Sequence, residues 1–237
     1  MFASFKRILT IAAITSLISG ILLTLAQQVQ VIPVILEAEK YEHAAGTDHH
    51  AATPAEHSHA SADIHAGEEA DWQPAEGLER NLYTALANIV VALGFALLLG
   101  AVAFLRGAKL DWRWGLVWGL AGYVVFFLSP ALGMSPELPG SHSGALEQRQ
   151  LWWLMTVVCT GSGLALVSFN AQTMVKILGV VLLVAPHIVG APHAPAPEGV
   201  VPPELIRSFI IATAVTNAVF WLALGGVYGF FDKKLSA

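Results

Sequence analysis

The chain has 237 residues, of which 55% are hydrophobic and only 12% are charged. Soluble domains average about 25% charged residues, so this composition, with a mean hydropathy of +0.63, favours a membrane protein. The net charge of -5 and the lack of a basic cluster argue against a nucleic-acid partner. A single cysteine excludes an internal disulfide framework.

Apolar stretches long enough to cross a bilayer, which takes roughly 17–25 residues, recur along the chain. They cover residues 8–26, 83–105, 114–132, 151–168, 174–190 and 208–231. The stretch 174–190 is the weakest, because it is short and carries Pro186 and His187 near its end. If it is re-entrant, five crossings remain. We therefore predict an all-α fold, a polytopic transmembrane helical bundle of about six spans.

The N-terminal span has a second interpretation. Lys6 and Arg7 precede it, and Thr24-Leu25-Ala26 resembles a signal-peptide cleavage site. Signal peptides have an apolar core of about 7–15 residues, and this run is longer, which favours an uncleaved signal-anchor. The predicted parts are then the span 1–26, a loop 27–82 and a transmembrane bundle 83–237.

Charge asymmetry gives an orientation. With the N-terminus in the cytoplasm and six alternating spans, eight basic residues fall inside and four outside, and only Asp111 and Asp232 of the acidic residues fall inside. We expect a multi-pass protein of the cytoplasmic (inner) membrane with both termini cytoplasmic. Tryptophans at span ends predict interfacial belts: Trp112, Trp114, Trp152 and Trp153.

The segment 27–82 is rich in Ala, His and Glu and has almost no large apolar residue after Leu36. It cannot bury enough surface to offset its ordering entropy, so we expect a disordered, extracytoplasmic loop. None of the nine histidines faces the cytoplasm in this topology. Imidazole is the commonest protein ligand for divalent transition metals, and nearby carboxylates concentrate cations. The candidate metal ligands are His43, His49, His50, His57, His59, His65, His142, His187, His193, Glu137 and Glu204.

Adjacent His49-His50 and alternating His57-Ser58-His59 can chelate a metal, but a mobile backbone gives little selectivity. The alternatives are a solvated spacer and a pH-sensing loop. His187 is either a first cation site at a pore mouth or simply wetted at the interface. Arg149 is expected to pair with Glu137, Glu147 or Glu204, which would fix loop geometry.

Other motifs concern packing. Gly115-x-x-x-Gly119 and Gly225-x-x-x-Gly229 favour close helix contact, and Asn88 and Asn217 are expected to join helices or line a path. Two spans end in similar dipeptides, Ser129-Pro130 and Ala185-Pro186, either as a weak internal repeat or by chance. No nucleophile–base pair, phosphate loop or dinucleotide motif appears, so we predict no catalytic residue, no cofactor-binding residue and no enzyme activity.

Four features resemble the predicted cobalt transporter subunit family CbtA. They are the N-terminal span followed by a His-rich loop, Pro136-Glu137-Leu138-Pro139-Gly140 running into Arg149-Gln150-x-Trp152-Trp153, Ala185-Pro186-His187-Ile188-Val189-Gly190-Ala191-Pro192, and Pro202-Pro203-Glu204-Leu205 before the last span. The resemblance implies cobalt uptake for cobalamin synthesis, about five spans, and a small single-span, His-bearing partner, CbtB.

The resulting hypothesis is a membrane subunit for divalent metal uptake, with Co²⁺ as the transported ion and no permanently bound cofactor. The outer loop would capture the ion, and the partners are the metal, membrane lipid and a CbtB-like subunit. The alternative is a non-transporting membrane metal sensor or scaffold, which uses the same loop but needs no polar path.

Overall fold

A computed structural model describes residues 2–48, 74–75, 77–138, 145–192 and 201–236, with residues 2–4 and 42–48 described by their backbone alone. All regular structure in these ranges is helical. The elements are α1 (Phe2–Gln30), α2 (Ile32–Asp48), α3 (Leu78–Leu105), α4 (Trp112–Tyr123), the π-helical turn η1 (Val124–Leu128), α5 (Ser129–Gly133), α6 (Leu146–Phe169), α7 (Thr173–Val189) and α8 (Pro203–Lys234).

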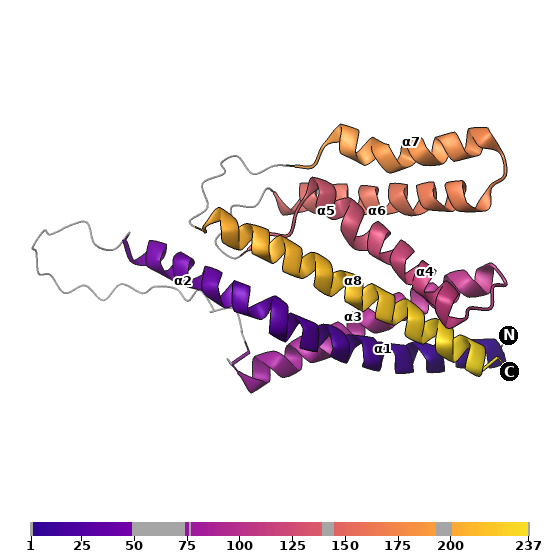
Figure 1. Cartoon of the computed structure of the whole chain (residues 1–237), viewed down its shortest axis with the longest axis horizontal. Helices are drawn as coiled ribbons and strands as arrows, with labels where there is room; N and C mark the ends of the chain where they lie inside the picture. The colour runs from indigo at the N-terminus through magenta and orange to yellow at the C-terminus, as the bar shows by residue number, and fades with distance from the viewer. Residues whose placement is uncertain (1, 49–73, 76, 139–144, 193–200, 237) are drawn as a thin grey trace, which may run out of the picture.

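The predicted transmembrane helical bundle is confirmed. Within the described ranges, five helical segments are long and apolar enough to cross a membrane: Phe5–Gln30, Leu78–Leu105, Trp112–Gly133, Leu146–Phe169 and Pro203–Lys234. The fifth predicted span, residues 174–190, corresponds to α7, which at 17 residues is shorter than these. Because α7 runs back along α6, the chain passes along the bundle a sixth time and both termini lie at one end (Figure 1).

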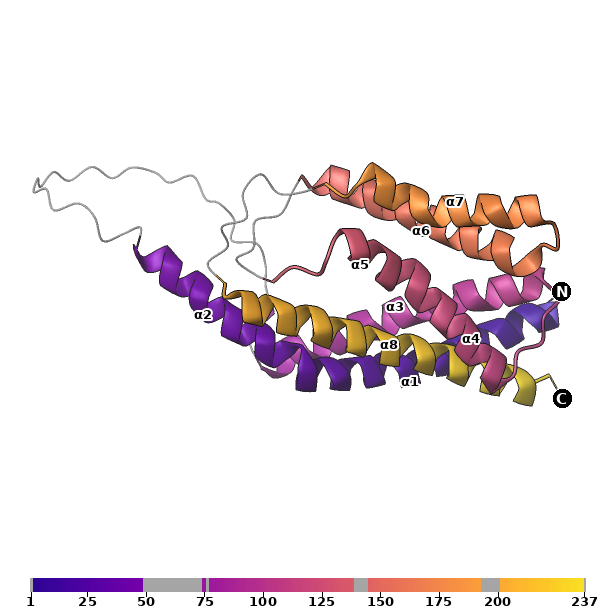
Figure 2. The same ribbon diagram turned by 45° about the horizontal axis from the view of Figure 1, so that its top comes forward.

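Helix α8 is the centre of the bundle, packing against α1, α2, α3, α4 and η1. Its side chains Phe220, Trp221, Leu224 and Tyr228 form the main apolar core with residues of α1 and α3. Large apolar side chains elsewhere point outward, as they should where lipid rather than water surrounds the helices. Helices α6 and α7 form a hairpin that lies side by side in both views and joins the rest mainly through η1 and α5 (Figures 1 and 2).

The two glycine motifs make the predicted close helix contacts, and the structure packs them on each other. A Cβ at Gly115 or at Gly225 would collide with the backbone carbonyl of the other residue, and one at Gly119 would collide with the carbonyl of Trp221. Helices α4 and α8 therefore touch backbone to backbone, an approach that only glycine permits.

The two span asparagines behave differently. Asn88 of α3 donates to Thr24 Oγ1 at 3.0 Å and to Gln27 Oε1 at 2.7 Å, so it joins α3 to α1 as predicted. Asn217 donates to the carbonyl of Thr213, four residues back in α8. Of its two predicted roles, joining helices is not seen in the described residues, because the amide donates within its own helix, and lining a path stays a prediction.

The predicted disorder of 27–82 is wrong at both ends. Helix α1 continues to Gln30, α2 occupies Ile32–Asp48, and α3 starts at Leu78. The reason is a second apolar cluster, in which Val31 and Ala38 pack with Leu138, Val201 and Phe209. The apolar residues that precede Lys40 thus pack against other helices. Since Ala and Glu are also strong helix formers, the segment forms a helix. Residues 49–73 and 76 lie outside the described ranges.

Candidate functional site

The structure describes the side chains of three predicted ligand residues, Glu137, His187 and Glu204. His43 lies in α2, but its side chain is not described. The remaining predicted ligands lie outside the described residues: His49, His50, His57, His59, His65, His142 and His193.

His187 lies in the last turn of α7, and its ring takes part in a polar cluster between three helices. The Nε2 atom is 3.3 Å from Ser129 Oγ of α5, and that hydroxyl is 2.8 Å from Thr160 Oγ1 of α6. Ser129 and Thr160 are both buried. This His187–Ser129–Thr160 cluster gathers one imidazole and two hydroxyl groups inside an otherwise apolar part of the bundle.

Trp152 holds the imidazole in place. Its Nε1 donates to the carbonyl of Pro186 at 3.3 Å, and its ring meets that of His187 edge-on, with centroids 6.2 Å apart. The prediction that Trp152 belongs to an interfacial belt is wrong, because this side chain is buried, with 5% of its surface exposed. Gly133 leaves room for it, since a Cβ there would collide with the indole.

The backbone before Ser129 is irregular for a clear reason. Pro130 has no N–H to donate to the carbonyl four residues earlier, that of Phe126. The chain widens into η1, and the N–H of Ser129 reaches back five residues to the carbonyl of Val124. Single π-turns inside α-helices occur often at functional sites. Here the turn sets the position of the Ser129 hydroxyl.

Glu137 and Arg149 form the predicted ion pair. Arg149 Nη2 lies 2.7 Å from Glu137 Oε2, with both side chains partly exposed. The pair connects the segment after α5 to the first turn of α6. The Glu137 carboxylate is therefore already paired with the Arg149 guanidinium, and a metal ion would have to share this carboxylate with Arg149. Glu204 is exposed in the first turn of α8.

The described residues do not supply a complete metal site. Nowhere in the described ranges do three His, Cys, Asp or Glu side chains come close enough to hold an ion together. One imidazole with two neutral hydroxyls is a weak ligand set compared with the three or four strong donors of a resident metal site. The cluster is suited to brief contact with a cation rather than to permanent binding.

Sequence reasoning missed Ser129, Thr160 and the inward position of Trp152. The similar dipeptides Ser129-Pro130 and Ala185-Pro186 were the available signal. In the structure the two proline-bearing span ends face each other, which brings Ser129 next to His187.

Comparison with known proteins gives one result. The model of the family described as "Probable cobalt transporter subunit (CbtA)" matches residues 5–233. No curated protein and no solved structure matches the chain. Because the match covers nearly the whole chain and every helix that packs in the bundle, this protein belongs to the CbtA family of probable cobalt transporter subunits.

Proposed function

We propose that the protein is the subunit through which Co²⁺, or a similar divalent cation, enters the cell. The observation that carries this is the His187–Ser129–Thr160 cluster, a polar group inside the membrane bundle of a chain in this family. It lies toward the end where α2 ends and α3 begins, the two described flanks of the His-rich segment (Figure 2).

The first step is capture. Helix α2 has 17 residues and spans about 25 Å at 1.5 Å per residue. It extends past the first residue of α8, so the His-rich segment is attached at the tip of an arm (Figures 1 and 2). His43 in α2 and the five histidines that follow this helix, His49, His50, His57, His59 and His65, bind the ion loosely and raise its local concentration.

The second step is transfer to the bundle. Glu137 after α5 and Glu204 in the first turn of α8 provide carboxylate ligands near the entry. His142 and His193, which lie outside the described residues, would add imidazole ligands there. His187 then offers its imidazole, with the hydroxyls of Ser129 and Thr160 beside it. These ligand types bind Ni²⁺ and Cu²⁺ at least as well as Co²⁺, so selectivity would depend on geometry and on metal supply.

Uptake of radiolabelled cobalt into proteoliposomes tests the proposal, with and without a small single-span, His-bearing partner subunit. Replacing the six loop histidines with glutamine should weaken the apparent affinity and leave the maximal rate unchanged. A matched control replaces Thr47, Thr53, Ser58 and Ser61 of the same segment with alanine. His187→Ala should lower the maximal rate about tenfold, the lower range for losing a group that supports metal binding.

Two results would contradict the proposal. One is wild-type cobalt uptake, under cobalt limitation, in cells that lack the protein. The other is liposome uptake no greater than that of empty vesicles, together with loss of the cellular response to cobalt when residues 43–65 are deleted. The second result would favour a membrane metal sensor.

A further inference from the structure

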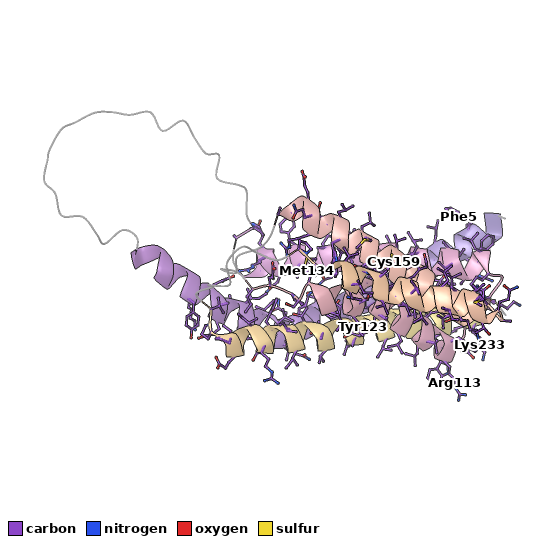
Figure 3. The ribbon with its side chains drawn as sticks, turned by 90° about the horizontal axis from the view of Figure 1, so that it is seen from above. Phe5, Arg113, Tyr123, Met134, Cys159 and Lys233 are labelled. Atoms are coloured by element: carbon purple, nitrogen blue, oxygen red, sulfur yellow. The ribbon has the colours of Figure 1, made fainter. Side chains whose placement is uncertain are left out.

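A pocket of about 380 Å³ opens at the end of the bundle that holds both chain termini, opposite the His187–Ser129–Thr160 cluster. It lies between the connection from α3 to α4 and the last turns of α8. Its lining residues are Lys109, Leu110, Asp111, Trp114, Lys233 and Ser236. Figure 3 shows Arg113 and Lys233 at this end and Met134 away from it.

The charge of the pocket favours an anion. Lys109 and Lys233 contribute two ammonium groups against the single carboxylate of Asp111. That carboxylate is already engaged, because Asp111 Oδ1 accepts the backbone N–H groups of Trp114 at 3.0 Å and Arg113 at 3.1 Å. The Trp114 N–H, above all, holds the pKa of Asp111 below its usual value, and the charge of Lys233 adds to the effect. A cation would therefore meet a net positive site.

Several other basic side chains at this end have aromatic or acidic partners. Arg7 pairs with Asp232, and Arg106 lies over the ring of Phe169, 3.4 Å from its centroid. Lys234 lies 6.0 Å from the centroid of Phe230. Lys109 and Lys233 instead line an open cavity, where their charges are available to a ligand.

The pocket lies at the level where the bundle leaves the membrane. One candidate span begins at Trp112, three residues after Lys109, and another ends at Lys234, the residue that follows Lys233. Trp114 keeps 61% of its surface exposed beside them. Tryptophan with lysine at a span end is typical of the headgroup region, where the indole meets both lipid and water.

We propose that this pocket binds the phosphate group of an anionic phospholipid. Basic pockets between membrane helices bind such headgroups, and the lipid supplies a phosphate at high local concentration at the level of the two lysines. A lipid bound there would contact both the start of α4 and the end of α8 and would hold the two together. The inference is independent of cobalt transport.

Native mass spectrometry of the full-length protein in detergent tests it, with phosphatidylglycerol titrated against phosphatidylcholine. The unmodified protein should retain phosphatidylglycerol preferentially. The double variant K109Q/K233Q should bind it about 30-fold more weakly. The matched control K176Q/K234Q removes the same charge at the same end but no lining residue, and should bind like the wild type. The variant K109R/K233R keeps the charge and should keep the lipid.

Three outcomes would overturn the proposal. They are equal binding of the two lipids by the unmodified protein, equal loss of binding in the two glutamine variants, and displacement of the lipid by millimolar inorganic phosphate, which would assign the pocket to a free anion. The lipid preference of the unmodified protein decides the matter even if a variant fails to fold.

Discussion

Asp232 is a buried carboxylate that joins three parts of the chain. Its side chain Oδ2 accepts the backbone N–H of Leu110 at 2.9 Å, and Oδ1 lies 3.4 Å from Arg7 Nη2. Only 4% of the residue is exposed. The start of α1, the connection from α3 to α4 and the end of α8 therefore meet at a single charged group.

Arg7→Gln should destabilise the protein more than Asp232→Asn. The first change leaves a buried carboxylate without its cation, which costs about 3 kcal/mol, the low end for a broken buried pair, because 34% of the Arg7 side chain is exposed. The second leaves a neutral amide whose oxygen still accepts from Leu110, so we expect a loss of about 1 kcal/mol. Chemical unfolding in detergent, followed by circular dichroism, measures both. A larger loss for Asp232→Asn would show that the carboxylate has no need of Arg7.

Thr160 and Thr156 offer a matched test of the His187–Ser129–Thr160 cluster. Both are buried on α6, but Thr160 contacts Ser129, whereas Thr156 donates to the carbonyl of Trp152 in its own helix. Thr160→Val should cost about 0.6 kcal/mol, the average for a hydrogen bond between membrane helices, and Thr156→Val should cost no more, because its bond lies within α6. Only Thr160→Val should also reduce cobalt uptake by proteoliposomes. Equal uptake by the two variants would remove the hydroxyls from the proposed path.

At the scale of helices, the sequence predicted each helix whose apolar run is long enough to cross a bilayer. It missed the helix that is stabilised by packing against distant parts of the chain. The five long spans follow from hydropathy alone. Helix α2 does not, because its stability depends on contacts of Val31 and Ala38 with residues more than a hundred positions away, such as Phe209. The π-turn before Ser129 could be expected only as some irregularity at Pro130, since the hydrogen-bond pattern depends on packing.

The contact between α4 and α8 should be intolerant of even one methyl group. In Gly225→Ala the new Cβ meets the backbone of Gly115 and Gly119, which no side-chain movement can relieve. We expect a loss of about 3 kcal/mol, the upper range for overpacking. Gly94→Ala is the control, because a Cβ at this position of α3 has nothing within 4 Å. Thermal unfolding of the two variants in detergent should differ clearly. Equal unfolding would mean that α4 and α8 can separate without loss.

For the whole molecule, charge placement in the sequence predicted which segments share an end of the bundle. The ends of α2, α5 and α7 and the starts of α3, α6 and α8 lie toward one end, and the chain termini lie at the other (Figure 1). The neighbours within that end could not be predicted. His187, Ser129 and Thr160 come from three different helices, and apolar periodicity shows which face of a helix is buried but not which helix covers it.

The proposed inward direction of transport requires the His-rich end to face outward, and the single cysteine makes this measurable. Cys159 lies within the α6 span, so Cys159→Ser gives a cysteine-free background with little change in packing. In that background a cysteine introduced by Ala60→Cys should react with a membrane-impermeant maleimide in intact cells. One introduced by Leu235→Cys, at the exposed C-terminal end of α8, should react only after the cells are permeabilised.

The reverse pattern would place the histidines in the cytoplasm, where they could receive a metal ion but not capture it from outside. The polar cluster would then stand at the exit of the bundle, and the charge asymmetry would have to be explained without the positive-inside rule.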